Sequence, residues 1–150
     1  MCFSLANRPP DPWTFRLHHH PISLTMSDYN RPFPDNGADI KPAFTRFREW
    51  YEFYFETHPD SDFRVPAPRV GLRWDSETEN KARLVVYPEV GKLTLGNLYW
   101  LISGAEGFLQ ANEWMELTFI AKNLDGETLG SGALYYVRAL RPSSNEPNVE

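Results

Sequence analysis

Apolar and polar residues recur along the chain with two periods, and these periods predict two helices and four strands. After Gly91, apolar residues fall at every third or fourth position, which is the spacing of one face of a helix. The spacing predicts a helix from Leu95 to Leu109. Thr94 precedes this helix and is suited to accept a backbone N–H group of the first turn.

Three glycines interrupt the predicted helix, namely Gly96, Gly104 and Gly107. Each glycine costs about 1 kcal/mol relative to alanine inside a helix. Two explanations remain open. Either the helix ends near Ser103, or the glycines allow another backbone to approach the helix closely.

A hairpin of two long strands is predicted after this helix. From Trp114 to Lys122 alternate residues are apolar, as in a strand with one buried face, and Ile120 is the exception on the polar face. Residues 123–126 have the composition of a turn, and the returning strand runs from Leu129 to Val137.

A second helix followed by a hairpin is predicted earlier in the chain. An aromatic stripe at helical spacing predicts a helix from Lys41 to Thr57, with Asp39 as its candidate cap and His58 at its end. Alternation over residues 70–74 and 82–87 predicts two strands joined by a polar turn. The stripe consists of Phe44, Phe47, Tyr51 and Tyr54.

Together these elements predict an α+β fold, in which a four-stranded antiparallel sheet carries two helices on one face in the order α-β-β-α-β-β. Periodicity alone does not distinguish a filled core from a strongly curved sheet that encloses a cavity under the helices. Residues 1–38 hold six of the 13 prolines and are predicted to form a Pro-rich arm. Residues 39–140 are predicted to form one domain and residues 141–150 a tail, with Met26 as an alternative start.

The aromatic content is the unusual feature of the composition. With 5 Trp, 7 Tyr and 10 Phe in 150 residues, the chain needs bulky core packing, an aromatic-lined cavity or an adhesive surface. The net charge of -5 argues against nucleic acid as a partner, because that binding depends on clustered Lys and Arg.

The cellular location is expected to be cytoplasmic. Cys2 is the single cysteine, which excludes an internal disulfide, and the first residues lack the charged leader and apolar run of a secretory signal. No continuous apolar segment is long enough to cross a bilayer, so we expect no membrane partner.

No catalytic signature is present. Ser131 lies between two glycines but enters a predicted strand, whereas a nucleophile elbow needs a strand-to-helix turn. The same glycines lack the third glycine and the helix of a dinucleotide-binding loop. We expect no cofactor, and no metal site either, because the consecutive histidines 18–20 lack partners that would close a coordination shell.

Six residues are candidates for binding. Arg69, Arg73 and Arg83 are predicted to form a small cationic patch on one hairpin, unless they pair with local acids such as Glu77 and Glu79. The other three candidates lie outside this hairpin: Trp13 as an anchor in the arm, Glu52 as an acid or base beside aromatic residues, and His58 at a helix end.

Two functions remain as hypotheses. The first is a non-enzymatic protein-interaction or binding domain, which engages a protein partner or a second copy through an exposed apolar patch or an open sheet edge. The alternative is a small cofactor-independent enzyme, or a carrier of a small apolar ligand, built around an aromatic-lined cavity. The lack of motifs favours the first hypothesis.

Overall fold

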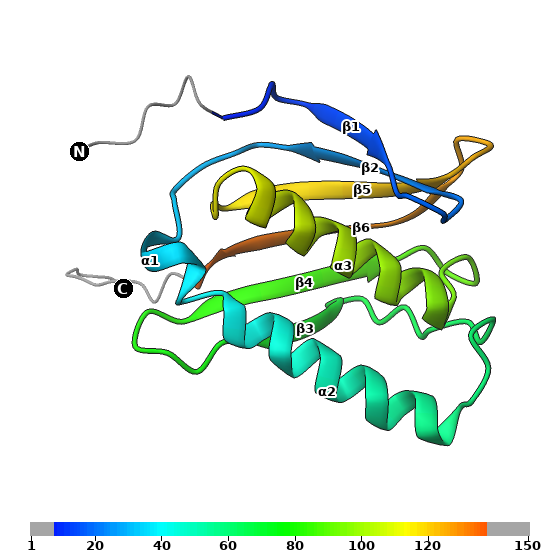
Figure 1. The fold of residues 1–150 in the computed structure, drawn as a ribbon. Coiled ribbons are helices and arrows are strands. Elements are labelled where there is room, and N and C mark those ends of the chain that lie inside the picture. The colour runs from blue at the N-terminus through cyan, green and yellow to red at the C-terminus, as the bar shows by residue number, and fades with distance from the viewer. Residues whose placement is uncertain (1–7, 138–150) are drawn as a thin grey trace.

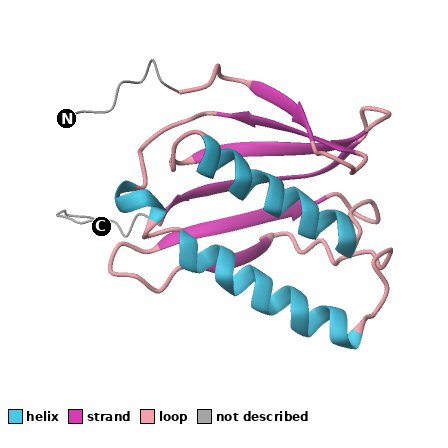
Figure 2. Ribbon diagram, viewed as in Figure 1, coloured by secondary structure: helices cyan, strands magenta, loops and turns pink. Residues whose placement is uncertain are grey.

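The computed structural model describes residues 8–137, which form a six-stranded antiparallel sheet with two long helices on one face (Figure 1). The strand order across the sheet is β1-β2-β5-β6-β4-β3. Both long helices lie in a single layer in front of the sheet, and within residues 8–137 the opposite face carries no helix (Figure 2). The elements in chain order are β1 (Trp13–Arg16), β2 (Ile22–Ser27), α1 (Pro34–Gly37), α2 (Lys41–Thr57), β3 (Leu72–Asp75), β4 (Ala82–Pro88), α3 (Leu95–Ala111), β5 (Leu117–Asn123) and β6 (Thr128–Tyr136).

The α+β class and the antiparallel sheet are confirmed, but the predicted four-stranded sheet with the order α-β-β-α-β-β is wrong. The sheet has six strands, and apart from the short turn α1 the order is β-β-α-β-β-α-β-β. The two additional strands, β1 and β2, come from the segment predicted to be a Pro-rich arm. The predicted tail at residues 141–150 lies outside the described residues.

The strand β2 forms because its residues alternate between apolar and hydroxyl side chains. Ile22, Leu24 and Met26 are fully buried under the helices, while the residues between them face the other side of the sheet. β2 pairs along its whole length with β5, so that Leu24 lies opposite Ala121. The prolines of this region flank the strands instead of interrupting them, which is the position that a sheet tolerates.

The helix α3 runs without interruption from Leu95 to Ala111, so it does not end near Ser103. The predicted cap is confirmed, because the hydroxyl oxygen of Thr94 accepts a hydrogen bond of 3.1 Å from the backbone N–H of Asn97. α3 has Glu106 as its one charged residue.

The glycines of α3 meet neighbours of different kinds. A Cβ atom on Gly104 would collide with the side chain of Leu17, which reaches over from the turn between β1 and β2. A Cβ atom on Gly96 would lie 3.2 Å from the backbone oxygen of Ser61. Close backbone approach therefore explains Gly96, whereas Gly104 makes room for a side chain.

The helix α2 begins without the predicted side-chain cap. Its N-cap residue is Ile40, and Asp39 instead accepts a hydrogen bond of 2.8 Å from the hydroxyl group of Tyr136 in β6. α2 buries Phe44 and Phe47 against the sheet. The layer between helices and sheet is packed with large apolar side chains, among them Phe33, Phe44, Phe47, Phe119, Leu84, Leu93 and Leu98.

Candidate functional site

The three arginines predicted to form a cationic patch have different surroundings. Arg83 on β4 donates two hydrogen bonds to the carboxylate of Asp75 on β3, at 2.7 and 3.1 Å. The Arg83 guanidinium holds the pKa of the Asp75 carboxyl below its usual value. Arg73 lies exposed on the same face of the sheet, and Arg69 lies exposed in the turn before β3. The partner of Arg83 is thus Asp75 and neither of the two glutamates considered from the sequence.

The remaining candidates are also placed by the structure. Trp13 begins the edge strand β1 opposite Met26 and is 43% exposed, so it belongs to the sheet. His58 caps the end of α2, where its ring packs 4.6 Å from the ring of Tyr54. Glu52 is exposed on α2 and forms no salt bridge within residues 8–137.

The most distinctive surface is a chain of five aromatic rings that crosses from α2 to α3 and on to the turn between β1 and β2. We call these residues the aromatic strip. Each ring contacts the next, with centroid distances of 5.9, 4.7, 5.0 and 3.9 Å along the chain. In order, the strip consists of Phe55, Tyr51, Tyr99, Trp100 and His20.

Local helix geometry places the strip. Tyr51 and Phe55 are one turn apart on α2, so their rings lie on the same flank of the helix. The C-terminal half of α2 lies beside the N-terminal half of α3, because the two helices run in opposite directions (Figure 1). Tyr99 therefore meets Tyr51, and the next residue, Trp100, points outward to His20.

The strip rests on a rigid base. Tyr51 and Tyr99 both pack against Phe47, which is almost fully buried and touches Trp74 on β3. A salt bridge of 2.8 Å between Arg48 and Glu106 also joins the two helices. Rings held in this way lose little conformational entropy when a partner covers them.

The outer members of the strip are accessible. Trp100 is 40% and Phe55 is 36% exposed, and the three rings between and beside them are partly buried. An aromatic side chain left this open gives up part of the apolar burial that would stabilise the fold. A contiguous group of such rings is therefore a candidate contact surface.

The strip carries three hydrogen-bond donors, namely two tyrosine hydroxyl groups and one indole N–H group. Burial and the nearby Tyr99 raise the pKa of the Tyr51 hydroxyl, so this group stays protonated at neutral pH. The hydroxyl groups of Tyr51 and Tyr99 and the indole N–H of Trp100 have no hydrogen-bond partner among residues 8–137. These donors remain available to an external acceptor.

Acidic side chains border the strip on the outer side of α2. Glu52 lies three residues before Phe55 and four before Glu56, so the three side chains are neighbours on the helix surface. Both glutamates are exposed, and neither is paired with a base in the described part of the chain. Asp60 and Asp62 follow in the loop after the helix. The strip therefore has a negatively charged border.

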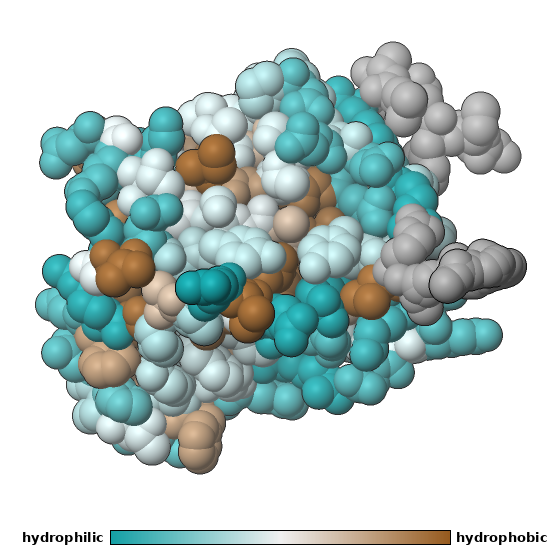
Figure 3. Space-filling view, turned by 180° about the vertical axis from the view of Figure 1, so that it is seen from behind, coloured by the Kyte–Doolittle hydropathy of each residue, from teal (hydrophilic) through white to brown (hydrophobic). Residues whose placement is uncertain are grey.

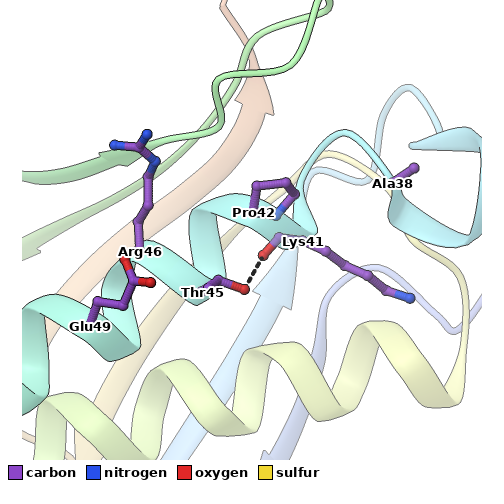
Figure 4. Close-up of a pocket in the computed structure, with 6 residues that line it drawn as sticks. All are labelled: Ala38, Lys41, Pro42, Thr45, Arg46 and Glu49. Carbon is purple, nitrogen blue, oxygen red and sulfur yellow. Dashed lines mark hydrogen bonds between the residues drawn. The ribbon is translucent and has the colours of Figure 1, made fainter.

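The surface hollows are less specific than the strip. One hollow, of about 490 Å³, lies between residues 32–36 and residues 112–114, and Glu113 in its wall is held by Arg8 at 2.8 Å. Another lies on the first turns of α2, where the charged ends of Lys41, Arg46 and Glu49 do not converge on one point (Figure 4). Neither hollow brings a set of polar groups onto a common ligand position.

The uncovered face of the sheet is a weaker candidate for a contact surface than the strip, because its polar groups form hydrogen bonds with one another. Thr14 bonds to Thr25 at 2.8 Å, and Ser27 bonds to Thr118 at 3.1 Å. Figure 3 shows this face as mostly pale, with separate apolar spots instead of one patch. Ile120 on β5 is 40% exposed, as its place on the polar face predicts.

Within residues 8–137, no three His, Cys, Asp or Glu side chains are grouped so that they could hold a metal ion. In the same part of the chain, no helix combines the length and the apolar character needed to cross a membrane.

Sequence reasoning found the border of the site but not its centre. Glu52 was a candidate, whereas Tyr51 was assigned to the aromatic stripe of a helix and His20 to a run of histidines without coordinating partners. The available signal was the position of Tyr99 and Trp100 next to the apolar stripe of α3, instead of within it. That signal shows which residues point outward but not that α2 brings other rings beside them.

Comparison with known proteins adds no functional information. No protein-family model, no curated protein and no solved structure matches this chain.

Proposed function

We propose that this chain is a non-enzymatic interaction domain that binds a partner peptide through the aromatic strip. The observation that carries the proposal is the unbroken contact of five partly exposed rings, supplied by three separate parts of the fold. Aromatic residues dominate the binding energy of protein interfaces because they bury a large area with few rotatable bonds.

The geometry favours binding over catalysis. The outer rings, Trp100 and Phe55, are exposed, and no strip residue lines either of the hollows described above. The Thr57 hydroxyl donates to the backbone oxygen of Tyr54 at 2.9 Å, so in its 3.0 Å contact with this hydroxyl the His58 ring is the donor and does not serve as a base. An apolar-ligand carrier or a cofactor-independent enzyme would instead need a water-excluding cavity with a titratable group.

The test is a selection of peptides from a random display library against the immobilised wild-type chain. We expect enriched peptides whose binding is weakened about tenfold or more by Phe55→Ala and by Trp100→Ala, since truncation of an aromatic hot spot typically costs more than a factor of ten. Phe53→Ala is the matched control, because Phe53 lies on the same helix, is 67% exposed and belongs to no part of the strip.

The outcomes separate clearly. Enriched peptides that bind Phe55→Ala, Trp100→Ala and the wild type equally well would overturn the assignment of the strip as the contact surface. A selection that yields no enriched peptide at all would overturn the peptide-binding function. Circular dichroism of each variant confirms that the fold is intact, which is expected because the side chains removed are exposed.

A further inference from the structure

We infer that the aromatic strip takes an extended, proline-rich peptide with positively charged residues. This inference rests on the proposed function and adds the chemistry of the partner. It follows from three properties of the site: the type of its polar atoms, the spacing of its rings and the charge of its border.

The polar atoms of the strip call for a partner that offers acceptors. The Tyr51 and Tyr99 hydroxyl groups and the Trp100 N–H have no acceptor among residues 8–137. A polyproline II peptide exposes unpaired backbone carbonyl groups, and its proline residues have no N–H group that would need an acceptor. Each ring can then donate to a carbonyl while its face packs on a proline ring.

The ring spacing agrees with the polyproline II repeat. The helix rises about 3.1 Å per residue with three residues per turn, so residues on the same side are roughly 9 Å apart. Neighbouring centroids between Phe55 and Trp100 are 4.7 to 5.9 Å apart. Two turns of the peptide, roughly 19 Å, are therefore long enough to reach from Phe55 to Trp100.

The charge of the border selects a cationic partner. Glu52 and Glu56 lie next to Phe55, and Asp60 and Asp62 follow in the adjoining loop. The nearby base Arg48 is already paired with Glu106. An arginine or lysine in the peptide would therefore meet carboxylates that form no salt bridge in the described chain.

Two other classes of partner fit less well. An amphipathic helix uses most of its backbone carbonyl groups internally, so only its side chains and its last turn offer acceptors to the three donors. A neutral oligosaccharide can stack on rings and accept hydrogen bonds, but it carries no positive charge to match the glutamates. Both classes are included as probes in the test.

The experiment is a fluorescence-polarisation titration of the full chain with a labelled peptide of four Arg-Pro-Pro repeats. Two matched peptides separate the contributions: four Glu-Pro-Pro repeats reverse the charge, and four Arg-Gly-Ser repeats keep the charge without the polyproline II preference. We expect the Arg-Pro-Pro peptide to bind at least about tenfold more tightly than either matched peptide, since both properties contribute.

Variants assign the contacts. We expect Trp100→Ala to weaken binding of the Arg-Pro-Pro peptide about tenfold. Tyr99→Phe removes only a hydroxyl donor and should weaken binding several-fold. Glu52→Gln combined with Glu56→Gln should weaken binding of the Arg-Pro-Pro peptide, and this loss of affinity should become smaller as salt is added, because salt screens the charges. The matched charge control is Glu77→Gln with Glu79→Gln, in the turn at the other end of the molecule (Figure 1), which should leave binding unchanged.

The inference is overturned if the Arg-Gly-Ser peptide binds as tightly as the Arg-Pro-Pro peptide, or if both pairs of glutamate substitutions have the same effect. The latter result would indicate attraction to the overall charge alone. Strip-dependent binding of a basic amphipathic helix, without binding of the Arg-Pro-Pro peptide, would refute the inference and keep the proposed function. Strip-dependent binding of chitohexaose alone would refute both.

Discussion

At the scale of single residues, a network around Glu116 ties the N-terminal segment to the end of the sheet. Glu116 is 6% exposed, and its carboxylate accepts hydrogen bonds from the backbone N–H of Arg31, the Arg31 side chain and the backbone N–H of Tyr136. The Arg31 guanidinium also lies over the Tyr136 ring, at 4.9 Å. One side chain therefore satisfies donors from two segments that are far apart in sequence.

Replacing Glu116 with alanine is expected to lower the free energy of unfolding by about 2–4 kcal/mol, because two partly buried N–H groups lose their acceptor. Glu116→Gln keeps one acceptor oxygen and should lose roughly half as much. Urea denaturation followed by circular dichroism measures both values. The exposed Glu79→Ala is the control, and a Glu116→Ala value no larger than this control would refute the structural role of the network.

The pair of Asp75 and Arg83 makes stability depend on acid pH. The folded pKa of Asp75 is lowered, mainly by its hydrogen bond to Arg83. The stabilisation from this pair is thus complete above the unfolded-state pKa of about 4 and is lost as the pH falls through the lower folded pKa.

Asp75→Asn should destabilise the protein by about 1–2 kcal/mol at pH 7, as expected for a hydrogen-bonded charge pair. The difference from wild type should persist at pH 5 and shrink below about pH 4, as shown by urea denaturation across that range. Asp125→Asn, in an exposed turn, should show no such dependence. A difference that stays constant down to pH 2 would contradict the lowered pKa.

At the scale of elements, the long helices and the strands β3 to β6 were readable from the sequence because each has a strong period of its own. The strands β1 and β2 were not, although Ile22 to Ser27 alternate without error. The high proline content of residues 1–38 favoured an irregular arm over this six-residue pattern. The pattern alone does not show that the prolines lie between strands and not within them. What brings β2 beside β5 is pairing over more than ninety residues of sequence, for example Leu24 with Ala121.

The aromatic strip could not be predicted from the sequence, for a related reason. Helical periodicity shows which flank of α2 carries Tyr51 and which flank of α3 carries Tyr99, but not that the two flanks face each other. The angle and offset of the helices come from the packing of Phe47 and its neighbours in the core. The position of His20 depends on strand pairing as well.

The role of β2 can be tested by a chain that begins at Met26. This variant lacks β1 and most of β2, so it removes Leu17, Ile22 and Leu24 from the core and leaves β5 as an unpaired edge. We expect loss of the cooperative unfolding transition, measured by thermal denaturation with circular dichroism. A chain that begins at residue 8 is the control. Cooperative unfolding of the shorter chain would show that the four remaining strands suffice.

At the scale of the whole molecule, two similar units lie side by side. Each unit is a helix followed by a hairpin, α2 with β3 and β4 and α3 with β5 and β6, and the second strands of the two hairpins pair at the junction. β1 and β2 extend the sheet beyond β5. The aromatic strip lies where the helices of the two units meet, so its geometry reports on the docking of the units.

The strand order also has a consequence for synthesis on the ribosome. β2 emerges early, but its two hydrogen-bonding edges are both paired only when β5 has been made, about ninety residues later. At the usual 5–20 residues per second, β2 waits roughly 5–20 s with one edge unpaired. For most of that interval, until α3 has been made, its apolar side chains Ile22, Leu24 and Met26 are not covered by that helix. The nascent chain is therefore expected to depend on chaperones that shield apolar segments until the last hairpin is released.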